Sequence, residues 1–340
     1  MKKMIVGGII LSLIIMLMFG FGVFRFEYPK NTGWFEGVIH IGTIEFPGYA
    51  ALYIAEEKEL FQKHGLNVVL DIYPSLTEVS EVFAESTTMQ GRTNLAFDVV
   101  EEAYQGIDQK IVAIADYSRG ADALIAIDPI DNVGDLVGKR IAVDPNSFQM
   151  YFLSAILKDV FLSLNEVQLV DSSTSNQSIE LLKNNEADAA VVFDPYLSRA
   201  LLDPQIHELS SSEDYPSTIV DVLSFRSDFV ETYPQTVQAF VDAYLEAVTF
   251  LSNSPEEAYQ IIAKKLHVTS DEVQSQLNRV QILDLQASKA AFHSGYSSNS
   301  IYAHLYELQS YLLRSVKYRS FVNTDTLIDP TFFRRANETL

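Results

Sequence analysis

The chain has 340 residues, enough for about two ordinary domains, and with 48% hydrophobic and 20% charged residues its composition is typical of globular proteins. The formal net charge of −21 disfavours binding to nucleic acids, because the phosphate backbone is also negative. There is no cysteine, which excludes disulfides, thiolate catalysis, cysteine zinc sites and the lipid-bearing cysteine of a bacterial lipoprotein.

Residues 1–24 differ in character from the rest of the chain. Two lysines precede an apolar stretch from Met4 to Phe24 that contains one polar side chain. A helix of this length spans about 31 Å, enough to cross a hydrocarbon core of about 30 Å. The stretch is interpreted either as a signal peptide or as an uncleaved signal anchor, and the weak cleavage site at Gly20 and Gly22 favours the anchor. Either way, the rest of the chain crosses the membrane, and residues 25–37 form a tether.

From Val38 onward, short apolar runs alternate with longer amphipathic stretches, a pattern typical of α/β folds. Strands are predicted at VIHIGTI, LNVVLDIY, TNLAF, IVAIADY and ALIAID, and helices at GYAALYIAEEKELFQKH and LTEVSEVFAES. A second set of the same kind begins near residue 130, with strands at RIAV, VQLVDSS and DAAVVF. From about Ser227 the chain is mostly helical, so this part is expected to pack on one of the two sheets.

Motifs for metal or nucleotide chemistry are weak in this sequence. No two of the six histidines stand four residues apart and no HExxH is present, so no metal site is predicted. The run GDLVGKR has three residues between its glycines where a P-loop has four, and Arg140 replaces the hydroxyl that binds magnesium. No cofactor is therefore predicted.

Polar and aromatic residues recur where predicted strands end and helices begin. In open α/β sheets ligands bind at this edge, where helix N-termini offer free N–H groups. Each residue also has a purely structural interpretation, since Asp and Ser are common helix caps and Gly and Pro are common in turns. The recurrence in both units favours a shared cleft. The candidate ligand-binding residues are Thr43, Glu45, Phe46, Tyr49, Asp98, Asp116, Tyr117, Ser118, Ser147, Asp194 and Tyr196.

A resemblance to a known family supports this interpretation. The segment Ile41 to Leu70 resembles the opening of the periplasmic solute-binding proteins of ABC importers for nitrate, taurine, aliphatic sulfonates and thiamine-precursor pyrimidines. The runs DLVGKRIAV, IELLKNNEADAAVVFDPYLSRAL and NTDTLIDPTFF are similar to later elements of that family. The resemblance covers nearly all of Val38 to Phe333.

The resemblance implies a two-lobed α/β periplasmic-binding-protein fold (type II-like) with hinge strands and a helical C-terminal part, preceded by one N-terminal hydrophobic helix. Lobe I is expected at 38–126 together with 222–340, and lobe II at 127–221. The aromatic candidates would stack on a ligand, the hydroxyls of Thr43, Ser118 and Ser147 would hydrogen-bond to it, and the carboxylates would accept hydrogen bonds from it.

The charge of the expected cleft bears on the ligand. Glu45, Asp98, Asp116 and Asp194 are expected to face it, with Arg119 as the only base nearby. Unpaired carboxylates would repel a sulfonate or nitrate, so a small, nitrogen-bearing, neutral or cationic ligand is predicted.

The expected function is that of a receptor, not an enzyme, which delivers its ligand to an ABC permease and its ATPase. It is expected on the periplasmic or extracellular face of the cytoplasmic membrane, anchored by residues 4–24. Two alternatives remain open: a membrane-tethered sensor on the same scaffold, and an enzyme acting on a pyrimidine precursor. The enzymes of this kind use a cysteine cluster, which this chain lacks.

Overall fold

The structure is a computed structural model that describes residues 33–145, 147–216, 218–295, 300–314 and 318–335. The expected signal segment at 1–24 and most of the tether at 25–37 lie outside these ranges. Within them, no helix combines the length and the apolar character needed to cross a bilayer.

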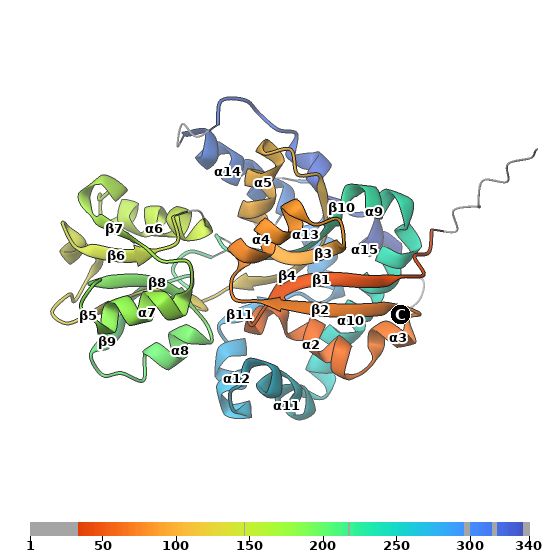
Figure 1. Cartoon of the computed structure of the whole chain (residues 1–340), viewed down its shortest axis with the longest axis horizontal. Coiled ribbons are helices and arrows are strands. Elements are labelled where there is room, and N and C mark those ends of the chain that lie inside the picture. The colour runs from red at the N-terminus through yellow and green to blue at the C-terminus, as the bar shows by residue number, and fades with distance from the viewer. Residues whose placement is uncertain (1–32, 146, 217, 296–299, 315–317, 336–340) are drawn as a thin grey trace, which may run out of the picture.

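Two separate sheets form the framework, one on each side of the molecule in Figure 1. The first sheet has six strands in the order β11-β4-β10-β3-β1-β2. Strand β1 runs parallel to β2 and β3, whereas β10 is antiparallel to β3 and β4, and β11 is antiparallel to β4. Its strands are β1 (Val38–Ile44), β2 (Asn67–Tyr73), β3 (Met89–Leu95), β4 (Gln109–Ser118), β10 (Val220–Arg226) and β11 (Val280–Ile282).

The second sheet has five strands in the order β7-β6-β8-β5-β9. Strand β6 is parallel to β7 and β8, and β5 is antiparallel to β8 and β9. The carboxyl ends of the parallel strands in each sheet point toward the junction of the two sheets (Figure 1). Its strands are β5 (Asp122–Ile127), β6 (Arg140–Val143), β7 (Gln168–Asp171), β8 (Ala189–Phe193) and β9 (Ile206–Ser211).

Helices cover both sheets, and those after β10 pack on the first sheet, as expected for the C-terminal part (Figure 1). The longest described helix, α10, begins at Pro234 because proline suits the first helical turn, and it buries one face over α2 and α3. The α-helices are α2 (Ala50–Glu57), α3 (Leu60–Lys63), α4 (Leu76–Glu85), α5 (Ala96–Tyr104), α6 (Phe148–Asp159), α7 (Ser175–Lys183), α8 (Tyr196–Ala200), α9 (Ser227–Thr232), α10 (Pro234–Asn253), α11 (Pro255–Leu266), α12 (Ser270–Leu277), α13 (Leu285–Ala291), α14 (Ile301–Arg314) and α15 (Thr331–Arg335). Four short 3-10 helices are η1 (Pro47–Tyr49), η2 (Val133–Leu136), η3 (Leu164–Glu166) and η4 (Thr324–Leu327).

The first predicted helix, residues 48–64, is divided in the structure. It begins as η1, continues as α2, and breaks at Glu59, which adopts a left-handed conformation with φ 54°. The break turns α3 so that Phe61 is buried and stacks on Phe240 of α10 with 5.1 Å between ring centroids. Strands β9 and β10 were not predicted, because their partners lie far away in the sequence.

The chain crosses between the two sheets at residues 119–121 and 212–219, and these two crossovers lie side by side. The Ser212 hydroxyl hydrogen-bonds to Ser118 Oγ at 2.7 Å and accepts from Gly120 N at 2.6 Å. Below, lobe I denotes the first sheet with its helices and lobe II the second sheet with its helices. The expected limits placed 122–126 in lobe I, whereas β5 pairs within the second sheet, so we propose the crossovers as the lobe limits.

Candidate functional site

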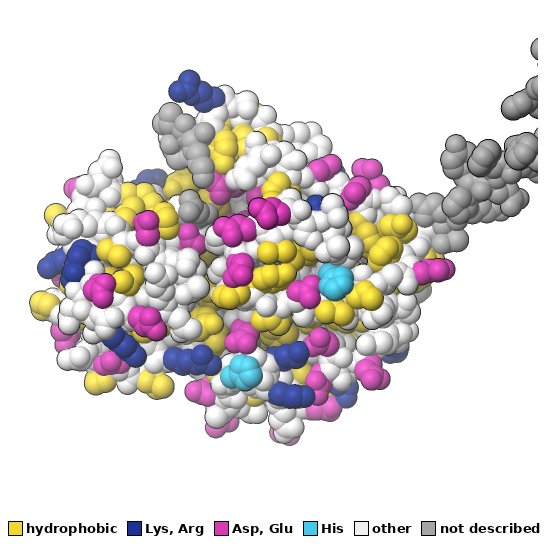
Figure 2. All heavy atoms as spheres, viewed as in Figure 1, with side chains coloured by type: hydrophobic (Ala, Val, Ile, Leu, Met, Phe, Trp, Pro, Cys, Tyr) yellow, Lys and Arg dark blue, Asp and Glu magenta, His cyan; other side chains and the backbone are white. Residues whose placement is uncertain are grey.

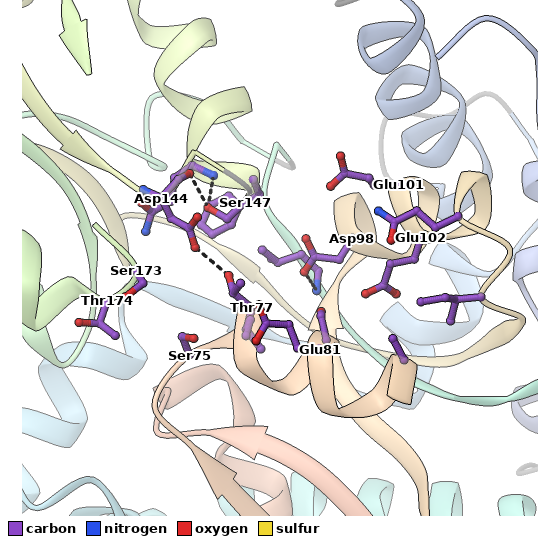
Figure 3. A pocket seen from close by; sticks show the side chains of 18 of the residues that line it. Ser75, Thr77, Glu81, Asp98, Glu101, Glu102, Asp144, Ser147, Ser173 and Thr174 are labelled. Atoms are coloured by element: carbon purple, nitrogen blue, oxygen red, sulfur yellow. Dashed lines mark hydrogen bonds between the residues drawn. The ribbon is translucent and has the colours of Figure 1, made fainter. Parts of the chain in front are cut away.

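A cavity of about 360 Å³, called the main chamber here, lies between the two lobes (Figure 3). Lobe I lines it with α4, α5 and the turn at Ser75 that follows β2. Lobe II lines it with the turns at the carboxyl ends of β6, β7 and β8. A volume of this size suits a small ligand.

A second, much smaller space of about 20 Å³, called the deep end, adjoins the main chamber. Both are lined by Leu76, Leu95, Phe148 and Phe193, which together are called the neck. Beyond the neck, the deep end is lined by two aromatic rings, the Ile44 side chain and two carboxyl groups; these residues are Ile44, Phe46, Tyr49, Asp122 and Asp221.

The lobe I wall of the main chamber is acidic. Figure 2 shows acidic side chains over the region of α4 and α5, beside the junction of the lobes. No Lys, Arg or His belongs to the described residues that line the chamber. Behind the wall, buried Arg92 pairs with Glu102, and it also donates from Nη1 to Ser80 Oγ at 2.9 Å. The carboxylates lining the chamber are Glu81, Glu85, Asp98, Glu101, Glu102 and Asp144.

Two of the aspartates hold protons more strongly than usual. Burial raises the pKa of Asp98 to about 8, with the Glu102 charge acting in the same direction and the Arg92 charge opposing it. Asp98 also accepts a hydrogen bond from Leu95 N at 3.3 Å, so it caps α5 as well. Burial likewise raises the pKa of Asp122 to about 7, while a hydrogen bond from Ser118 lowers it.

Two further buried acids are Asp116, which lines none of these spaces, and Asp221, which lines the deep end. Asp116 is fully buried, neither of its carboxyl oxygens has a hydrogen-bond partner among the described residues, and a Cβ on Gly48 would lie 1.9 Å from its Oδ2. Burial, together with the charges of Asp221 and Asp122, raises the pKa of Asp116 well above its usual range. The Tyr49 hydroxyl donates a hydrogen bond to Asp221 Oδ1. The raised pKa values mean that burial favours the neutral form of Asp116 and Asp221, which costs less to bury than a charged carboxylate.

The lobe II wall is made of hydroxyl groups and aromatic rings. Ser147 caps α6, because its Oγ accepts from Gln149 N at 3.2 Å. Asp144 accepts a hydrogen bond from Thr77 Oγ1 of lobe I at 2.7 Å, and this bond crosses the cleft (Figure 3). A second contact across the cleft is an aromatic one, with Tyr151 of α6 stacked on Phe97 of α5.

The candidate residues fall into three groups in the structure. Phe46, Tyr49, Asp98 and Ser147 line the main chamber or the deep end. Glu45 and Tyr196 line a separate space of about 250 Å³ that shares Phe193 with the other two. The remaining candidates are buried near the junction and line none of these spaces; they are Thr43, Asp116, Tyr117, Ser118 and Asp194.

Three of the residues in the last group, Thr43, Ser118 and Asp194, have structural hydrogen-bond partners instead. Thr43 Oγ1 accepts from Thr93 Oγ1 at 3.0 Å within the first sheet. Ser118 ends β4 and hydrogen-bonds to Ser212 of the second crossover, and Asp194 Oδ1 accepts from Ser198 N in the first turn of α8 at 2.9 Å. Tyr117 is a buried residue of β4. We keep a direct ligand role as a proposal for the residues that line the cavities.

The sequence predicted the α4 helix but did not identify the residues of α4, or of two turns, that line the main chamber. Ser75 and Thr174 directly follow β2 and β7 as N-caps of the next helices, so the rule that ligands lie at carboxyl ends of strands could have found them. Asp221 gave no local signal, because it lies in β10, whose pairing with β3 and β4 joins distant parts of the chain.

Comparison with known proteins places the chain among binding proteins. It is 24% identical over 238 residues to a binding protein of Brucella abortus, covering 68% of this chain and 72% of that protein. It is 28% identical over 148 residues to the taurine-binding periplasmic protein of Escherichia coli, covering 43% of this chain and 45% of that protein.

Solved structures share the fold. The periplasmic aliphatic sulphonate-binding protein SsuA of Escherichia coli superimposes with a TM-score of 0.71 at 16% identity, covering 88% of this chain and 99% of that one. The nitrate-binding protein NrtA of Synechocystis PCC 6803 has a TM-score of 0.68 at 14% identity and covers 89% of both chains. The two lobes therefore form the periplasmic-binding-protein fold. Residues 47–258 match the NMT1/THI5-like family model, and the chain belongs to this family.

Proposed function

We propose that this chain is an extracytoplasmic solute-binding receptor that captures a small, nitrogen-bearing ligand between its two lobes and delivers it to an ABC permease and its ATPase. The observation that carries the proposal is the main chamber, which both lobes line at the carboxyl ends of their parallel strands. Relatives with the same fold are named as taurine-, sulfonate- and nitrate-binding proteins, and one neighbour is the ligand-binding component of an ABC-type import system from Staphylococcus aureus.

The proposed ligand differs in charge from those of the named relatives. Six carboxylates line the main chamber, and Arg92 pairs with one of them, Glu102, from behind. An anion entering this space would lose its water shell without gaining a cationic partner among the lining residues. A neutral or cationic ligand that carries N–H donors suits the same wall, because carboxylates accept charge-assisted hydrogen bonds.

The proposed location is the periplasmic or extracellular face of the cytoplasmic membrane, with residues 4–24 as an anchor. We propose binding without turnover, since the family relatives named above are binding proteins and the chain has no cysteine nucleophile.

Native mass spectrometry of the full chain, purified without refolding, tests the proposal. A small molecule that co-purifies in a one-to-one complex, and that is lost when the main chamber is blocked by Ser147→Trp, is the expected result. Two results together would overturn the proposal: the purified chain releases no small molecule, and a strain lacking the gene takes up small amines at an unchanged rate.

A further inference from the structure

The deep end has the dimensions and lining of a site for a single ammonium group. Its volume of about 20 Å³ is room for about one water-sized group. Four aromatic rings line it, those of Phe46, Tyr49, Phe148 and Phe193, and aromatic faces attract cations. The rings of Phe46 and Phe193 approach each other from the two lobes with 6.1 Å between centroids.

A single carboxyl oxygen without a hydrogen-bond partner among the described residues bears on what this space takes. Asp122 is 4% exposed and lines the deep end, and its Oδ2 has no hydrogen-bond partner within the described chain. A buried acceptor left without a donor destabilises the folded chain, so the geometry favours a ligand that brings a donor to this atom. The neighbouring acid, Asp221, already accepts a hydrogen bond from Tyr49.

The deep end adjoins the main chamber at the neck. The side chains of Leu76, Leu95, Phe148 and Phe193 line both spaces, so a ligand that occupies both would contact these four apolar side chains. In the main chamber, the lobe I wall again presents carboxylates, with Asp98 and Glu101 of α5 opposite the lobe II turns (Figure 3). The deep end and the main chamber therefore both present carboxyl groups, and the four neck residues that the two spaces share are apolar.

We infer that the ligand is a linear diamine or a similar organic dication, with one ammonium group at Asp122 and Asp221, methylene groups in the neck, and the second cationic group beside Asp98 and Glu101. This inference rests on the proposed function and gives it a substrate class. A bare metal ion suits the deep end poorly, because its lining offers two carboxyl groups and otherwise apolar or aromatic side chains, and no cluster of three or more His, Cys, Asp or Glu side chains that could hold a metal occurs among the described residues.

Isothermal titration calorimetry of the full chain in detergent, at pH 8, tests the inference. The probes are the α,ω-diamines from propane-1,3-diamine to hexane-1,6-diamine, butylamine as the monocation, butane-1,4-diol as the neutral analogue, and taurine and nitrate as anions. We expect one diamine length to bind best, and at least about tenfold more tightly than butylamine, because a second charge-assisted contact contributes more than about 1.4 kcal/mol.

Variants locate the two ends. Asp122→Asn and Asp98→Asn are each expected to weaken diamine binding by about 10- to 100-fold, while Asp131→Asn, at an exposed site of lobe II outside the cavity, leaves it unchanged. Repeating the titration at pH 6, where Asp122 with its pKa of about 7 is mostly protonated, in buffers of different ionisation enthalpy should show proton release on binding, which Asp122→Asn reduces. Circular dichroism of each variant verifies that it is folded.

The possible outcomes separate this inference from the proposed function. Equal affinity for butylamine and for every diamine, or unchanged binding in Asp122→Asn, would overturn the two-ended dication while a receptor for amines remained. Binding of taurine or nitrate without binding of diamines would overturn the inference and leave the receptor function in place. If none of the probes binds and no small molecule co-purifies, both proposals fail.

Discussion

The two walls of the cleft are built from different chemistry. The lobe I wall carries the carboxylates of α4 and α5, whereas the lobe II wall carries hydroxyl groups and aromatic rings, with Asp144 as its one acid among the described lining residues. Both walls stand at the carboxyl ends of parallel strands, so the fold alone does not explain the difference. For the main chamber, we propose that the lobe I wall selects the charge of a ligand and that the lobe II wall covers it.

The largest expected effect concerns the one buried cation behind the lobe I wall. Arg92→Met should lower the free energy of unfolding by about 3 to 5 kcal/mol, because it leaves Glu102 buried without a cation. Urea unfolding followed by circular dichroism measures the loss. The double variant Arg92→Met/Glu102→Gln is the control and should regain most of the stability. A double variant no more stable than the single one would show that the wall does not depend on this pair.

The next effect is a dependence on pH. The pKa of Asp122 is raised in the folded chain to about 7, whereas the unfolded chain has the usual value of about 3.8, so between pH 4 and pH 7 the folded state holds a proton that the unfolded state has released. The wild-type chain therefore loses stability relative to Asp122→Asn as pH rises, by about 2 to 3 kcal/mol between pH 5 and pH 7.

Urea unfolding of both proteins at pH 5, 6 and 7 measures this difference. Burial lowers the pKa of His304 to about 4, which acts in the opposite direction, but it does so in both proteins and cancels in the comparison. A constant difference across the three pH values would mean that Asp122 is already ionised in the absence of ligand.

A smaller effect is expected at the hydrogen bond that joins the two walls. Thr77→Val removes the donor to Asp144 and should weaken ligand binding by about fivefold, equivalent to about 1 kcal/mol, because the bond forms across the cleft. Thr77→Ser keeps the hydroxyl and serves as the matched control. Calorimetry with the co-purified ligand or the best-binding diamine gives both affinities. A loss in Thr77→Ser with none in Thr77→Val would point to packing of the Thr77 methyl group instead.

The smallest effect should come from the lobe II hydroxyls. Ser173 is exposed at the chamber, and Ser173→Ala is expected to change affinity by less than about twofold, corresponding to less than about 0.5 kcal/mol. Glu101→Gln on the opposite wall should reduce affinity by about tenfold in the same assay. A reversed order would contradict the assignment of charge selection to lobe I.

The sequence predicted the fold better than the details of the site. The alternation of strands and helices, together with the family resemblance, predicted the two-lobed fold, and the fold comparison confirms it. Turn chemistry singled out Phe46, Tyr49, Asp98 and Ser147, which line the cavity, because ligands approach strand ends and these residues follow strands directly.

The rest of the site depends on long-range structure. Asp122 and Asp221 come together only because β5 and β10 begin where the two crossovers end, and no local pattern contains that pairing. Thr43 and Asp194 stand at predicted strand ends, as the cavity residues do, yet in the structure they hydrogen-bond to Thr93 and Ser198. A capping or sheet interaction and a ligand contact look alike in sequence.

The hydrogen bonds of Ser212 have a mechanical consequence. This hydroxyl joins the second crossover to Ser118 at the end of β4 and to Gly120 of the first crossover, so bending of the two connections is coupled. A rotation of one lobe against the other about an axis near Ser212 is the motion that would keep these bonds intact. In such a rotation each wall of the cleft would move together with its lobe. The relative position of the two outer lobe surfaces would then differ between the ligand-free and the ligand-bound receptor, and a permease could distinguish the two states by this difference.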